Sequence, residues 1–150
     1  MPFLAGQKLT AGQLDRIQPR IYEGAATSAL AVSTTTYADI VGATVTFTTT
    51  AANAKFKADA VFDASVGTTS ATNLMVGRLV VDGTPDSGGL AVYAMDVQDR
   101  ATIAQEWTGT LAAAGTHTLK LQGACTASGS GSGNFLQSDT KIIVTVTEVP

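Results

Sequence analysis

Short segments in which apolar and polar residues alternate constrain the fold of this chain more than any other feature. The pattern is clearest in 55–63, where Phe56, Ala58, Ala60 and Phe62 lie two residues apart. A period of two places successive side chains on opposite faces of a β-strand, so this segment predicts a strand with one buried face. Similar patterns predict further strands at 28–32, 36–40, 44–48, 74–81, 90–97, 103–107, 117–122, 135–136 and 141–148.

Turn residues separate these segments and indicate the fold class. Asp82-Gly83 and the 85–89 segment are hairpin signals, because glycine adopts positive φ easily and proline fixes its own φ. In 106–122 two alternating runs flank a turn that contains glycine, which predicts strand, turn and strand. No helical periodicity follows Arg20, so we expect an all-β protein, an antiparallel β-sandwich of the jelly-roll type. A chain of 150 residues can bury such a core in one domain without disulfides.

The first twenty residues differ in character from the rest. Thr10 followed by Gln13 matches a capping box, and Pro19 should end the short helix that begins there. We therefore expect an N-terminal arm at 1–25 and a jelly-roll domain at 26–150. The arm either packs on its own domain or anchors the chain to another subunit. The residues that would form the anchor are apolar: Phe3, Leu4, Leu9, Leu14, Ile17 and Ile21.

Composition restricts the partners. Only 14% of the residues are charged, against about 25% in average soluble domains. A neutral surface rich in threonine and alanine suits contact with a second copy. The net charge of -3 and the scattered basic residues predict no nucleic-acid binding. No apolar run could span a bilayer and no signal peptide is recognisable, so we expect neither membrane insertion nor ordinary secretion.

Candidate catalytic residues have structural explanations. His117 shares a strand face with Leu119 and Leu121, which predicts a buried structural histidine. Glycoside hydrolysis requires two carboxylates that face each other across a cleft. Asp59 and Asp63 are instead expected on the exposed face of one strand. No serine occupies a nucleophile elbow. Trp107 is expected in the core, and Cys125 as a small buried hydrophobe. We therefore expect no enzymatic activity, no catalytic residues and no cofactor.

The sequence also predicts no metal site within the chain. A single histidine and a single cysteine are too few for zinc, and Asp82 and Asp86 lack EF-hand spacing. Two arrangements stay open: calcium held between loops by aspartates, and a metal shared by three His117 side chains on a threefold axis.

Four segments together resemble a known group of proteins: RLVVDG at 78–83, QEWTGTL at 105–111, AGTHTLKL at 114–121 and the closing strand at 142–149. They are similar to β-sandwich modules of bacteriophage structural proteins, which are in turn similar to the tumour-necrosis-factor and C1q type of jelly roll. The opening segment 3–14 likewise resembles the starts of phage tail-fibre and head-associated proteins.

This resemblance implies a virion component made in the host cytoplasm, either a capsid decoration or head-fibre protein or a small tail protein. It implies a homotrimer that contacts other capsid or tail proteins. The alternative is a host-surface or glycan-binding module of a tail fibre, in which the loops at 68–73 and 127–134 would contact a host glycan. A third possibility, the accessory domain of a secreted hydrolase, disagrees with the lack of a signal peptide.

Overall fold

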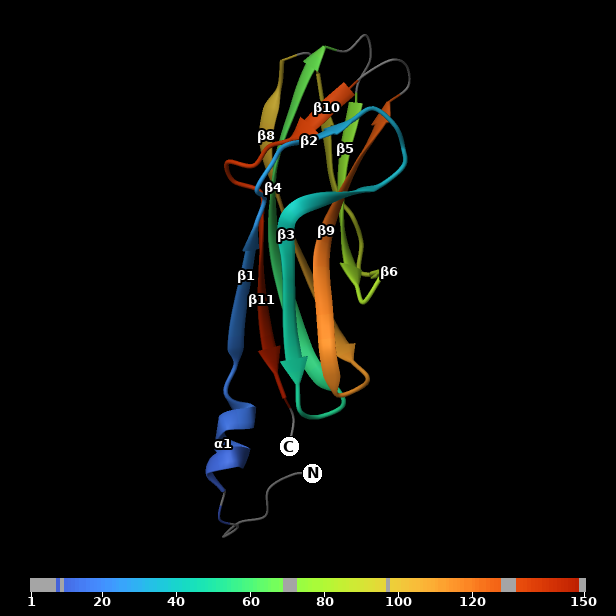
Figure 1. Ribbon diagram of the computed structural model, residues 1–150. Coiled ribbons are helices and arrows are strands. Elements are labelled where there is room, and N and C mark those ends of the chain that lie inside the picture. The colour runs from blue at the N-terminus through green and yellow to red at the C-terminus, as the bar shows by residue number, and fades with distance from the viewer. Residues whose placement is uncertain (1–7, 9, 69–72, 97, 128–131, 149–150) are drawn as a thin grey trace.

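The computed structural model describes residues 8, 10–68, 73–96, 98–127 and 132–148, and these form two antiparallel sheets and one short helix, α1 (Ala11–Ile17). The predicted all-β sandwich is confirmed. Figure 1 shows the long strands running along the long axis of the molecule, with α1 beyond one end of the sheets. We call this end the base.

The first sheet is built around the longest strand, β4 (Ala54–Thr68). One edge of β4 pairs with β11 (Lys141–Thr147) and β10 (Ser132–Phe135), and the other edge pairs with β8 (Arg100–Leu111). β1 (Arg20–Ala25) pairs with β11, and β2 (Leu30–Val32) pairs with β10. The last six residues of the predicted arm are thus β1.

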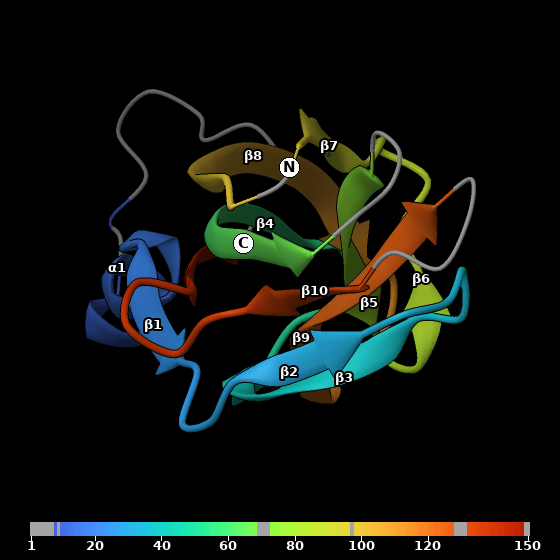
Figure 2. The same ribbon diagram turned by 90° about the horizontal axis from the view of Figure 1, so that it is seen from above.

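In the second sheet, β9 (Gly115–Ala127) lies between β3 (Ala38–Thr49) and β5 (Asn73–Val81). The other edge of β5 pairs with β6 (Thr84–Pro85) and β7 (Ala91–Met95). The Asp82-Gly83 turn between β5 and β6 has positive φ at both residues, as the hairpin signal predicted. Viewed along the strands, β4 and β8 lie on one side of the sandwich and β3 on the other (Figure 2).

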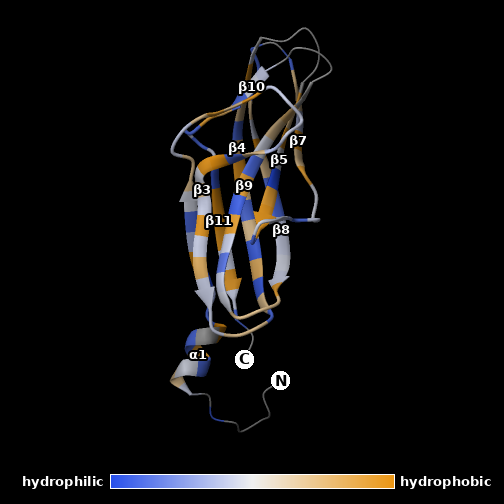
Figure 3. Cartoon of the chain, turned by 45° about the vertical axis from the view of Figure 1, so that its right-hand side comes forward, coloured by the Kyte–Doolittle hydropathy of each residue, from blue (hydrophilic) through white to orange (hydrophobic). Residues whose placement is uncertain are grey.

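The core lies between the sheets, where the apolar side of each alternating segment is buried. Figure 3 shows the alternation of hydrophobic and hydrophilic residues along the strands. Phe62 packs edge-on against both Trp107 and Phe135, at centroid distances of 6.4 and 5.8 Å. Glycine makes room for these rings: a Cβ at Gly77 would lie 2.5 Å from the Phe62 ring. The predicted burial of Trp107, His117 and Cys125 is confirmed.

Candidate functional site: the N-terminal helix and the base of the sandwich

The helix α1 is short and its start is set by side chains. The Thr10 side chain accepts a hydrogen bond from the backbone N–H of Gln13, and the Gln13 side chain accepts one from the backbone N–H of Thr10. This reciprocal pair confirms the predicted capping box. The helix ends at Ile17, and Pro19 follows after the extended Gln18.

The helix carries apolar side chains outside the core. Leu14 is 45% exposed, Ile17 is partly buried, and Ile21, on β1, is 70% exposed. None of the three belongs to the core cluster. Of the other predicted anchor residues, Phe3, Leu4 and Leu9 lie outside the described residues. Figure 1 shows α1 beyond the end of the sheets. With Leu14 exposed there, the helix has an apolar side chain that a partner could contact.

A set of charged residues joins this helix to the base. The Arg20 guanidinium lies 3.3 Å from the Asp15 carboxylate on α1 and 3.5 Å from the carboxylate of Glu148. Glu148 is buried and accepts hydrogen bonds from the Thr50 N–H, the Thr50 hydroxyl and the Ala51 N–H at 2.9, 2.6 and 2.9 Å. Burial opposes ionisation, but these bonds and Arg20 outweigh it and lower the pKa of Glu148.

Sequence reasoning missed the roles of Arg20 and Glu148. The two residues lie at opposite ends of the chain and come together because β1 pairs with β11. The opposite charges of Arg20 and Glu148 were the only sequence signal for this ion pair. That signal can be interpreted only once the pairing of β1 with β11 is known.

The His117 ring has a hydrogen-bond partner at each nitrogen. Nδ1 lies 2.7 Å from an Asp82 carboxylate oxygen, and Nε2 lies 3.1 Å from the Ala113 carbonyl oxygen. Asp82 also accepts the backbone N–H of Thr118 at 2.8 Å. A general base needs a free nitrogen beside a nucleophile. Here the ring instead ties the β5–β6 turn to the β8–β9 turn, which is a structural role.

The expectation that Asp63 lies on an exposed face was wrong. Its side chain is 1% exposed, because Arg100 and the turn between β10 and β11 cover this part of the sheet. Arg100 donates two hydrogen bonds to the Asp63 carboxylate, at 2.9 and 2.6 Å, and the Ser138 hydroxyl donates a third at 2.7 Å. The Arg100 hydrogen bonds lower the pKa of Asp63, which burial alone would raise.

Asp59, in contrast, is half exposed, as expected. Lys57 lies between the carboxylates of Asp59 and Glu106, with both N–O distances at 3.0 Å. Asp59 and Asp63 therefore have separate basic partners, and the structure does not bring them together as an acid–base pair.

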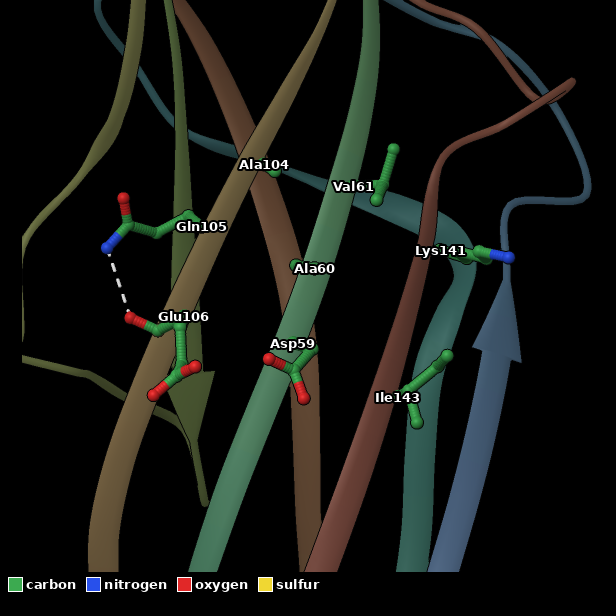
Figure 4. A pocket seen from close by; sticks show the side chains of 8 residues that line it. All are labelled: Asp59, Ala60, Val61, Ala104, Gln105, Glu106, Lys141 and Ile143. Atoms are coloured by element: carbon green, nitrogen blue, oxygen red, sulfur yellow. Dashed lines mark hydrogen bonds between the residues drawn. The ribbon is translucent and has the colours of Figure 1, made fainter.

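A shallow pocket of about 400 Å³ lies on the outer face of the first sheet, over β4, β8 and β11 (Figure 4). Val61, Ala104 and Ile143 line it together with charged side chains, and none of its lining residues is aromatic. It therefore offers no stacking platform for a sugar ring. The loops of the glycan-binding alternative include 69–72 and 128–131, which lie outside the described residues.

Within the described ranges, no three metal-ligating side chains come close enough to hold an ion. The described helix is also too short to cross a bilayer. Burial raises the pKa of the Cys125 thiol, which keeps it protonated and weakly nucleophilic.

No protein family and no curated protein matches this sequence. Among solved structures, the Eiger TNF from S. frugiperda aligns with a TM-score of 0.50 and 8% identity, over 88% of this chain and 92% of that one. A chain from the structure of infectious bursal disease virus aligns with a TM-score of 0.45 and 10% identity. This alignment covers 87% of this chain and 33% of that one. The carbohydrate-binding module CBM36 aligns with a TM-score of 0.38 and 14% identity, over 87% of this chain and 95% of that one.

At such identities these alignments concern the fold alone. The alignment with Eiger TNF agrees with the predicted TNF-type sandwich. The phage assignment and the homotrimer stay predictions.

Proposed function

We propose that this chain is a non-enzymatic structural protein of a phage particle, a capsid decoration, head-fibre or small tail protein that assembles as a homo-oligomer. Its N-terminal helix attaches it to a neighbouring capsid or tail protein. The observation that carries the proposal is the position of α1: the sandwich has a closed core of its own, while Leu14 and Ile21 remain exposed beyond it.

Two further observations support an attachment role. The base fixes the start of β1 through Arg20, so the helix projects from an anchored point. The resemblance of the opening segment to phage head and tail proteins, noted from the sequence, concerns the same part of the chain. Association through such a helix would bury apolar area that the monomer leaves in water.

The test is incorporation into particles of the phage that encodes the chain. Leu14→Asp and Ile21→Asp place a charge at exposed apolar positions, so we expect the domain to fold and incorporation to be lost. Val41→Asp is the matched control, because Val41 is 59% exposed on β3, in the other sheet. Normal incorporation of both arm variants would refute the attachment role, as would equal loss with the control. Light scattering at micromolar concentration tests self-assembly, and a monomer there would contradict it.

A further inference from the structure

The two long sides of the sandwich differ. On the side of β1 and β3 the sheets are joined: the Thr27 N–H donates to the Val41 carbonyl at 2.8 Å, and the Tyr22 ring stacks on Phe47 at 4.9 Å. The other side is formed by β7 and β8, which lie next to each other (Figure 2). In the described part of the chain no backbone hydrogen bond connects these two strands. One side-chain bond links them nearby: the Trp107 indole N–H donates to the Gly89 carbonyl, just before β7, at 2.9 Å. We call this the open side.

The strand β8 is a long edge strand. It pairs with β4 through twelve residues without a shift in register, and no other described strand pairs with it. Proteins usually protect such edges with proline, bulges, short length or several charges. β8 has no proline and no bulge, and its charged residues are Arg100, which binds Asp63, and Glu106.

One side-chain contact shows which backbone groups of β8 point outward. The Gln105 amide donates to the Glu106 carbonyl oxygen at 3.0 Å, on the side of β8 away from β4 (Figure 4). In an antiparallel pair, residues alternate between those that bond the neighbouring strand and those that point away. The N–H and C=O groups that face the open side therefore belong to Thr102, Ala104, Glu106, Thr108 and Thr110, all of which are exposed.

Apolar side chains gather on the same side. Among the described residues, seven large apolar side chains are exposed, and Leu90, Val92 and Tyr93, on β7 or immediately before it, are three of them. Each is close to half exposed. An exposed apolar group beside unpaired strand backbone is typical of a surface that a partner covers.

We propose that β8 pairs antiparallel with β8 of a second copy across a twofold axis, and that the apolar side chains of the open side flank this contact. The occupant is a second copy because a row of alternating donors and acceptors is complementary to itself in the antiparallel direction. Like charges directly opposite are unfavourable, so the axis does not pass through Glu106. This inference identifies a contact for the self-assembly proposed above, and it predicts an even number of copies rather than a trimer.

Thr108→Pro tests the pairing. It removes an N–H that points away from β4, so the fold is expected to persist, while the association constant should fall about tenfold or more. Thr46→Pro is the matched control, at an exposed position on β3. Its partner Thr118 bonds Asp82 on the β5 side, so the Thr46 N–H also points away from the neighbouring strand. Molar mass is measured by light scattering over a range of concentrations, with circular dichroism as the check on folding.

A cysteine scan gives a second measurement that does not depend on proline. In a Cys125→Ala background, single cysteines at 102, 104, 106, 108 and 110 should form disulfide-linked dimers most readily at the residue nearest the axis, which should not be 106. A Thr46→Cys control should not form them. An oligomer that Thr108→Pro leaves intact, a trimer, or cross-linking no greater than that of the control would overturn the β8 contact while leaving self-assembly standing. A monomeric wild-type chain would overturn both.

Discussion

The Asp63 carboxylate allows a sharp test of what holds this sandwich together. It is buried and accepts two hydrogen bonds from Arg100 and one from Ser138. Asp63→Asn removes the charge and turns an amide N–H2 toward one of these donors. Hydrogen bonds to charged groups contribute about 1.5–3 kcal/mol each, but Arg100 is half exposed and regains part of this from water. We expect the free energy of unfolding to fall by about 2–3 kcal/mol at neutral pH.

The matched control lies on the same strand. Asp59→Asn makes the same chemical change in an exposed ion pair with Lys57 and should cost no more than about 0.5 kcal/mol. Urea unfolding followed by the fluorescence of Trp107, the sole tryptophan, measures both variants. Equal and small effects of the two substitutions would refute the argument that the buried pair stabilises the sandwich.

The contribution of Asp63 to the free energy of unfolding should also depend on pH in a defined direction. Because the folded pKa of Asp63 is lowered, the unfolded chain takes up its proton first as pH falls. Its contribution is therefore complete above about pH 5 and is lost below about pH 4, as pH falls through the folded pKa. Asp63→Asn should flatten the acid side of the stability curve relative to wild type. An unchanged acid slope would contradict the assigned role.

Three other substitutions test separate parts of the structure by the same unfolding assay. Gly77→Ala places a methyl group 2.5 Å from the Phe62 ring and should lower the free energy of unfolding by about 1–3 kcal/mol. Gly67→Ala enters open space and should change it by less than about 0.5 kcal/mol. Equal effects of the two substitutions would contradict the packing argument. His117→Leu should cost about 1–2 kcal/mol through the loss of two ring hydrogen bonds, and a neutral result would show that water replaces them fully. Glu148→Gln should lower the free energy of unfolding by about 1–3 kcal/mol at neutral pH, and by less as pH falls through the lowered pKa of Glu148. A loss that does not depend on pH would contradict a stabilising role of the ionised carboxylate.

Alternation predicted which face of the sheet most side chains would occupy. The assignment of His117, Leu119 and Leu121 to one buried face was correct because a strand has a fixed period of two. Asp63 obeys the same period and lies on the outer face, yet it is buried. The residues that cover it, such as Ser138, lie 75 positions further along the chain, and no local pattern reports them.

On the outer face of the second sheet, too, some residues are buried that alternation does not predict to be buried. Val76, Val80 and Ala124 are buried there although they do not belong to the core between the sheets. The segment before β3 lies close to this face: the Cys125 N–H donates to the Thr34 carbonyl at 3.1 Å, and the Arg78 guanidinium lies 3.8 Å from the centre of the Tyr37 ring. These contacts depend on where a loop returns, which hydropathy alternation does not encode.

The proposed assembly surfaces were beyond sequence reasoning for a related reason. A period of two records the face on which a side chain lies, but not whether another strand follows at the edge. β8 and β9 both alternate, yet β9 has a partner on each side and β8 has only β4. Edges become visible only when the whole strand order is known. The variants on the N-terminal arm and on β8 therefore separate two properties that the same pattern conceals. Leu14→Asp and Ile21→Asp should abolish attachment without changing self-association, and Thr108→Pro should do the reverse.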